Sequence, residues 1–228
     1  MNRAKFSFAT LMASSTHDLK NILGSVLESV DWLFDNAKSL NVEQRSELEK
    51  VAQLVAHVNS ELLQLLCFYK FENEQYRLLI QEQDIESFIN MQAAFFKSLI
   101  RTNKVKFTQE FDQNLTWFFD DVLLTTAVRN AVMNSIKHAK SKIILNVDIV
   151  NKFLCISVED DGPGFPENML GDFKDEIGDI DLTTNGTGLG LFFANQVAKM
   201  HVVKDKFGYI KLDKSQLLGG AKFSIYIP

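Results

Sequence analysis

The segments EDDGPGF at residues 159–165 and NGTGLGLFFANQVAKM at residues 185–200 lie about twenty residues apart in a region where β-like and helical runs alternate, which predicts an α/β layer domain. The first follows an apolar, β-like run and places Asp160 two residues before a glycine of a turn. A buried carboxylate there can accept the exocyclic amine of adenine, and glycines let the backbone approach the ring. The second places three glycines before an apolar-periodic helix, where backbone amides can bind phosphates. Taken singly, the first segment is better explained as a tight turn, and the second is also typical of a glycine-rich helix entry made for close packing.

A third segment, RNAVMNSIKHAK at residues 129–140, precedes both and is predicted to be helical. Asn130 and Asn134 are one turn apart and therefore share a face. Magnesium prefers oxygen ligands, so the amide oxygen of Asn134 and triphosphate oxygens would form a plausible site. Lys137 could neutralise phosphate charge, although an ordinary solvated helix position explains it equally well.

The order Asn-x-x-x-Asn, DxGxG and GxGxG within one α/β region resembles the N, G1 and G2 boxes of the GHKL (Bergerat) ATPases, which include DNA gyrase, MutL and histidine kinases. The tail LGGAKFSIYIP looks like the closing strand of that family. The resemblance implies an α/β sandwich that uses ATP and Mg2+. It makes Asn134 the magnesium ligand and Asp160 the adenine acceptor. The nucleotide-binding positions that it implies are Asn130, Asn134, Lys137, His138, Asp160, Gly162, Gly164, Gly186, Thr187, Gly188, Leu189 and Gly190.

One position discriminates among these ATPases. Members that hydrolyse ATP carry a glutamate four residues before the metal-binding asparagine, where it serves as general base for water. This chain has Asn130 there, and an amide cannot take that proton. The site is therefore predicted to hold ATP for transfer to a group other than water, as histidine kinases do.

The segment HDLKN at residues 17–21 resembles the H box of histidine kinases. The resemblance implies His17 as nucleophile and phosphoacceptor, and Asp18 as general base. Asn21 would position water for dephosphorylating the partner. The phosphoryl group would then pass to an aspartate in the receiver domain of a response regulator.

Periodicity divides the chain into two halves. Residues 6–75 contain no proline and read as an antiparallel helix pair, with turn and capping chemistry at residues 36–42. The apolar stripe of the second helix is too wide for one partner helix, so two hairpins are expected to form a dimeric four-helix bundle. After residue 80, β-like runs alternate with helical patterns at residues 85–100, 123–138 and 189–200. The predicted fold is thus α plus α/β, with a dimerisation and histidine phosphotransfer hairpin at 1–78, a polar hinge within 73–84, and an ATP-binding catalytic domain at 79–228.

Charge and hydropathy narrow the function. Lys and Arg total 24 against 29 Asp and Glu, so the net charge of -5 disfavours nucleic acid as a partner. No apolar run approaches the ~20 residues that span a bilayer, and the first residues lack a signal-peptide core. We therefore expect no membrane insertion and a cytoplasmic location. Cys67 and Cys155 are expected to be buried thiols.

The chain departs from the family pattern in three places. Ile22 replaces the proline that often follows the H box. The segment between the glycine boxes is short and acidic, with Phe173 and Lys174 the only trace of an F box. Ser135 stands where the family usually has alanine, a change expected to be tolerated. The alternatives to an autokinase are a histidine phosphotransfer protein and a phosphatase-type regulator that keep the kinase architecture without autokinase activity.

Overall fold

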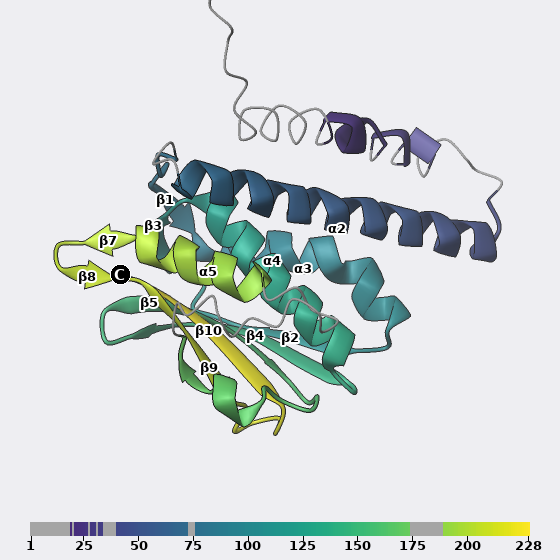
Figure 1. Ribbon diagram of the computed structural model, residues 1–228. Helices are drawn as coiled ribbons and strands as arrows, with labels where there is room; N and C mark the ends of the chain where they lie inside the picture. Colours follow the sequence, from purple (N-terminus) through teal and green to yellow (C-terminus); the bar gives the residue numbers. More distant parts are fainter. Residues whose placement is uncertain are drawn as a thin grey trace, which may run out of the picture. The chain divides into compact units, whose positions relative to one another are not determined.

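The computed structural model of the protein describes residues 19, 21–26, 28–30, 32–33, 40–72, 76–173 and 189–228. The chain divides into two compact units, Met1–Arg77 and Leu78–Pro228. In the described residues, the first unit is helical, and the second combines a six-stranded sheet, two two-stranded sheets and three α-helices (Figure 1). Among the described residues, no helix has the length and apolarity needed to cross a membrane.

The helical unit contains described helical residues between positions 19 and 33, followed by α2 (Val42–Glu72). A reciprocal cap begins α2. The backbone N–H of Gln44 donates to Asn41 Oδ1 at 2.8 Å, and the backbone N–H of Asn41 donates to Gln44 Oε1 at 3.0 Å. This pair satisfies two amides near the helix start, which is the role of a capping box. It confirms the capping chemistry expected near residue 41.

A six-stranded mixed sheet forms one layer of the α/β unit, in the order β2-β4-β5-β10-β9-β6. Only β2 and β4 run parallel, and every other neighbouring pair is antiparallel. The strands are β2 (Lys106–Glu110), β4 (Lys142–Val150), β5 (Phe153–Asp160), β6 (Gly171–Asp172), β9 (Tyr209–Lys214) and β10 (Ala221–Ile227). The expected β-like runs in this sheet are therefore confirmed as strands.

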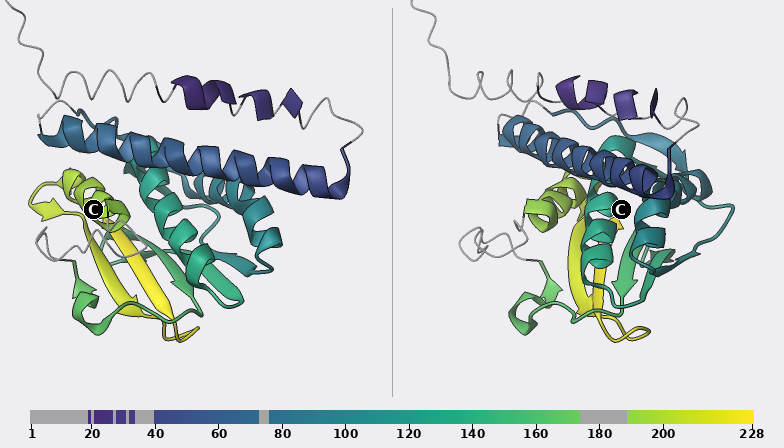
Figure 2. Two further views of the ribbon diagram at one scale, coloured as in Figure 1. Left: turned by 45° about the vertical axis from the view of Figure 1, so that its right-hand side comes forward. Right: turned by 90° about the vertical axis from the view of Figure 1, so that its right-hand side faces the viewer.

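Three helices cover one face of this sheet, as the rotated views show (Figure 2). They are α3 (Ile85–Thr102), α4 (Asp121–His138) and α5 (Leu189–Met200). Their apolar side meets the alternate, inward-facing residues of the strands, which excludes water from the space between the layers. The largest fully buried side chains come from both layers and include Ile89, Phe96, Leu123, Leu124, Ile143, Leu145, Leu154, Ile156, Phe193 and Ile210.

Four features were not expected, and one of them is the short strand β6. β1 (Gln81–Asp84) lies inside the stretch expected to be a polar hinge, and it pairs antiparallel with β3 (Thr116–Phe119) as a separate two-stranded sheet. Its polar sequence lacks the apolar alternation that would predict a strand. The strand forms because β3 supplies its hydrogen-bonding partners. Asp84 also caps α3 by accepting from the Ser87 amide at 2.8 Å. The other two features are short, namely the hairpin of β7 (Val202–Val203) with β8 (Lys206–Phe207) and the 3-10 turn η1 (Glu167–Met169).

Candidate functional site

The carboxylate of Asp160 is the buried polar centre of the α/β unit. Asp160 is the last residue of β5, and only 2% of it is exposed. Its Oδ2 accepts from the Ser135 hydroxyl at 2.9 Å. Its Oδ1 accepts from the backbone N–H of Gly162 at 2.8 Å and of Ala221 at 3.3 Å. Helix α4, the G1 turn and strand β10 thus each contribute a donor, and these donors offset the cost of burying the group.

The G1 turn requires glycine at two positions for different reasons. A Cβ on Gly162 would lie 2.6 Å from the carbonyl oxygen of His138 and 2.9 Å from Asp160 Oδ1. Gly164 has a φ of +84°, a region that disfavours residues with a side chain. The backbone of the turn therefore passes close to the end of α4. Such a close approach was the reason for expecting glycine in this segment.

Asp161, which the sequence reasoning did not single out, anchors this turn to the loop between α4 and β4. Its carboxylate accepts from the Ser141 hydroxyl at 2.6 Å and from the amides of Lys140, Ser141 and Lys142 at 2.8 to 3.1 Å. Desolvation raises the pKa of this carboxyl, but hydrogen bonds from Ser141, Lys142 and Lys140 outweigh it and hold the pKa well below its usual value. The doubled aspartate before the glycine was the available signal.

Helix α4 carries the N-box residues along the site. Asn130 is half-buried, whereas Asn134, Lys137 and His138 are exposed. Gly190, in the first turn of α5, lies against Asn130, because a Cβ there would be 3.6 Å from the Asn130 side chain. The structure therefore brings the N box next to the start of the G2 helix, which begins at Leu189.

Some expected site residues lie outside the described residues, namely Gly186, Thr187 and Gly188 of the G2 loop and His17 and Asp18 of the H box. Asn21 is described, and it is an exposed helical residue of the Met1–Arg77 unit. The roles of His17 and Asp18 in phosphoryl transfer thus stay a prediction.

Gly220 and Ala221 complete the site from the far end of the chain. A Cβ on Gly220 would lie 2.5 Å from the Gly162 amide nitrogen and 2.8 Å from Asp160 Oδ1. From the sequence, this segment was expected only as a closing strand. Its paired glycines were the signal for a close backbone approach.

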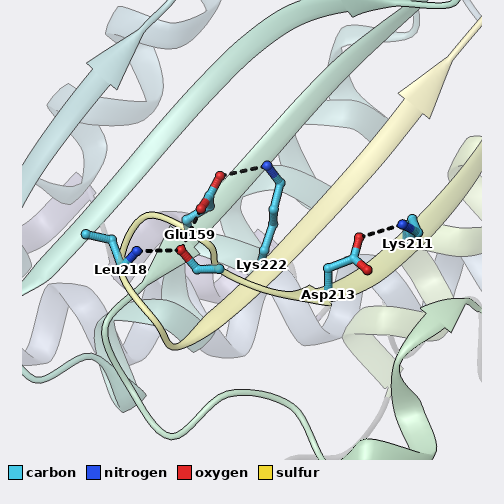
Figure 3. A network of polar contacts seen from close by, with 6 residues as sticks. Glu159, Lys211, Asp213, Leu218 and Lys222 are labelled. Atoms are coloured by element: carbon cyan, nitrogen blue, oxygen red, sulfur yellow. Dashed lines mark hydrogen bonds and ion pairs between the residues drawn. The ribbon is translucent and has the colours of Figure 1, made fainter.

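A buried polar network holds this closing segment beside the turn (Figure 3). Glu159, 3% exposed, accepts from Lys222 Nζ at 2.7 Å and from the Ser215 hydroxyl at 2.6 Å. The hydroxyl in turn accepts from the Leu218 amide at 2.9 Å. Strand β10 and the loop before it are therefore tied to β5 one residue before Asp160.

The donor chemistry of α4 fits a magnesium ion that is also held by phosphate oxygens. No cluster of three or more His, Cys, Asp or Glu side chains occurs among the described residues. Asn134 is exposed on α4, and its side-chain amide offers one hard oxygen. Magnesium keeps several waters and takes much of its shell from substrate phosphates, so a single oxygen ligand from α4 is compatible with such an ion.

Comparison with known proteins finds a family model that matches most of the α/β unit. Residues 119–228 match the family of histidine kinase-, DNA gyrase B- and HSP90-like ATPases. The sensor histidine kinase CpxA of Escherichia coli (strain K12) is 32% identical over 111 residues, which cover 46% of this chain and 22% of CpxA. The chain spans less than half the length of each curated relative compared, from 15% to 44%.

Two solved structures extend the likeness. The catalytic domain of histidine kinase ThkA is 25% identical with a TM-score of 0.55, covering 65% of this chain and 97% of that domain. Full-length ShkA, solved in complex with AMPPNP, shares the fold over 96% of this chain and 45% of its own, with a TM-score of 0.65 at 21% identity. The donors around Asp160, the N box beside Gly190 and these matches lead to one conclusion: residues 119–228 are similar to the histidine kinase-, DNA gyrase B- and HSP90-like ATPases, and the α/β unit resembles the catalytic domain of a histidine kinase.

Proposed function

We propose that this chain transfers the γ-phosphoryl group of ATP to His17 and then to an aspartate in the receiver domain of a response regulator. The observation that carries the proposal is the buried Asp160 carboxylate, which α4, the G1 turn and β10 hold in place at the end of β5. A fixed acceptor suits the exocyclic amine of adenine. The exposed polar side chains of α4, which precede it in the sequence, suit phosphates.

Helix α4 would bind the phosphate end of ATP. Asn134 would hold magnesium through its amide oxygen, and the ion would neutralise phosphate charge. Lys137 and His138 are exposed in the last turn of α4, where a cation can approach phosphate oxygens without being desolvated. Backbone amides of the G2 segment, including those of Leu189 and Gly190, would also donate hydrogen bonds to the phosphates.

Asn130 favours transfer to histidine over hydrolysis. It lies next to Gly190, and its amide cannot act as a base for water. The neutral imidazole of His17 would attack the γ-phosphorus while the bond to the bridging oxygen of ADP breaks. Asp18 would accept or hydrogen-bond the proton on the other ring nitrogen. A pure phosphotransfer protein would not need the Asp160 arrangement, so it is the less favoured function.

The helical unit supports dimerisation and exchange with a partner. Large apolar side chains are exposed on both of its helical segments, including Leu19, Ile22, Val26, Leu54, Val58 and Leu65. A second copy of the hairpin would cover them and form a four-helix bundle. Asn21 is exposed on the first segment, where it could position water for reverse dephosphorylation of the regulator. We place this activity in the cytoplasm, with ATP and Mg2+ as cofactors.

The test is incubation with γ-labelled ATP and Mg2+, comparing the wild type with His17→Ala and Asn134→Ala. Label that is acid-labile, base-stable and lost in both variants is the expected result. Asn90→Ala is a matched control, because Asn90 is an exposed asparagine on α3 and outside the site. It should label normally. ATP binding without labelling of the wild type, or normal labelling of His17→Ala, would contradict the proposal.

Dimerisation has a separate test. The double variant Leu54→Ala/Val58→Ala removes apolar area from two side chains that are 65% and 46% exposed. Sedimentation at several concentrations should show weaker self-association than in the wild type. An unchanged dissociation constant would place the interface elsewhere.

A further inference from the structure

The Ser135 hydroxyl contacts the side of Asp160 that the backbone amides leave open. Ser135 lies on α4 and is 6% exposed. Its hydroxyl donates to Asp160 Oδ2, whereas the amides of Gly162 and Ala221 both donate to Oδ1. Both carboxylate oxygens therefore accept hydrogen bonds. The bond from Ser135 determines which acceptor position on Oδ2 stays open.

The number of acceptor positions then limits what the site can bind. A carboxylate has about four lone-pair positions. Two on Oδ1 and one on Oδ2 are occupied by the donors just named, which leaves one acceptor position on Oδ2. The Ser135 hydroxyl has a single hydrogen and directs it at Asp160, so its oxygen can only accept. Two neighbouring oxygens, Asp160 Oδ2 and the Ser135 hydroxyl oxygen, can thus only accept hydrogen bonds from a ligand.

We propose that Ser135 is a positioning residue that orients Asp160 so that the site selects 6-amino purines over 6-oxo purines. The inference rests on the proposed function, because it assumes that Asp160 receives the base of ATP. A 6-amino group donates to the open position on Oδ2. A 6-oxo group would place an acceptor against two acceptors and leave buried groups unpaired, which a polar site rejects strongly.

The experiment measures binding of ADP and inosine diphosphate to the full chain by calorimetry in Mg2+. Ser135→Ala should weaken ADP binding by about tenfold, which corresponds to one lost hydrogen bond. Binding of inosine diphosphate, which lacks the amino group, should change little, so the selectivity ratio falls. Ser135→Thr keeps the hydroxyl and should retain most of the selectivity.

Ser157→Ala is the matched control. Ser157 lies on β5, is 1% exposed and has a hydroxyl with no hydrogen-bond partner, so its removal should leave both affinities unchanged. Thermal unfolding of each variant confirms that a folded protein is being compared.

The possible results separate the two proposals. Unchanged ADP affinity in folded Ser135→Ala would overturn the inference and leave the proposed function standing. An equal loss for both nucleotides would also overturn it, since Ser135 would then support only the fold. A wild type that binds neither nucleotide would overturn the proposed function and the inference together.

Discussion

The α/β unit and the helical unit differ in how much of the large apolar side chains on their helices is exposed to solvent. In the α/β unit, Leu123 of α4 and Phe193 of α5 are fully buried between helices and sheet. In the helical unit, Leu54 and Val58 of α2 remain 65% and 46% exposed. Burial of apolar surface is the main force for folding, and the α/β unit contains its own core. The exposed apolar side chains of the helical unit are the basis of the dimerisation proposed above, because exposed apolar faces often mark interaction surfaces.

The largest test of this contrast removes one aromatic ring from the α/β core. Phe193→Ala should lower the free energy of unfolding by about 4 kcal/mol, because it deletes a fully buried ring and leaves a cavity. Leu54→Ala, in the exposed face, should change it by less than about 1 kcal/mol in the monomer. Urea denaturation followed by circular dichroism measures both. Similar losses would mean that the two units do not differ in this way.

A second test adds a methyl group at a glycine of each unit. Gly220→Ala would place a Cβ 2.5 Å from the Gly162 nitrogen, so we expect a loss of about 3 kcal/mol in stability and weaker ADP binding. Gly24, in the helical unit, has no neighbouring atom within 4 Å of the point where a Cβ would lie. Gly24→Ala should therefore stabilise its helix by about 0.5 to 1 kcal/mol. Thermal unfolding of both variants measures these changes. A Gly220→Ala variant as stable as the wild type would contradict the close approach of Gly220 to Gly162.

A third test compares two ion pairs within the α/β unit, both visible in Figure 3. Lys222→Met leaves the 3%-exposed Glu159 without its cation, which should cost about 2 kcal/mol. Lys211→Met removes a pair with Asp213 whose side chains are 39% and 36% exposed, which should cost about 0.5 kcal/mol. Denaturant unfolding at low and high salt measures each cost. Equal costs would show that burial does not distinguish the pairs.

The smallest effect concerns His201, which links the end of α5 to the start of α4. Its Nε2 accepts from the Asp120 amide at 3.0 Å, so its proton lies on Nδ1, which donates to the Val197 carbonyl at 2.7 Å. Burial lowers the pKa of His201 below its ordinary value of 6.5, and the Val197 bond and the charge of Asp120 offset this only in part. The unfolded chain therefore binds a proton that the folded chain does not, between the lowered pKa and 6.5.

Stability contributed by His201 is consequently complete above pH 6.5 and declines as the pH falls toward the lowered value. His201→Gln removes the titrating group, so its melting temperature should decline less over the same range. Melting temperatures of the wild type and of His201→Gln are measured in steps from about pH 7.5 to about pH 5. Their difference reports on His201 alone, because the carboxylates titrate in both proteins. Parallel curves would contradict the assignment.

The local sequence was sufficient for elements with a clear period or a clear cap. The runs of β4, β5 and β10 and the helices α4 and α5 were expected within a few residues of their observed bounds. The strand β1 was missed because its sequence, QEQD, has no apolar alternation and its strand conformation depends on pairing with β3. Gly220 was not placed in the site because its role is set by residues distant in the sequence.

Motif order and the resemblance to the GHKL ATPases predicted Asp160, Gly162 and the N box as parts of one nucleotide site, since those residues lie within single turns or helices whose geometry is local. Only the folded chain revealed that Ser135 and Ala221 donate to the same carboxylate, across sequence separations of 25 and 61 residues. The physical reason is strand pairing: β10 lies antiparallel to β5 with Lys222 opposite Glu159, which brings the end of the chain to Asp160. Such pairing depends on the whole sheet, and no local pattern specifies it.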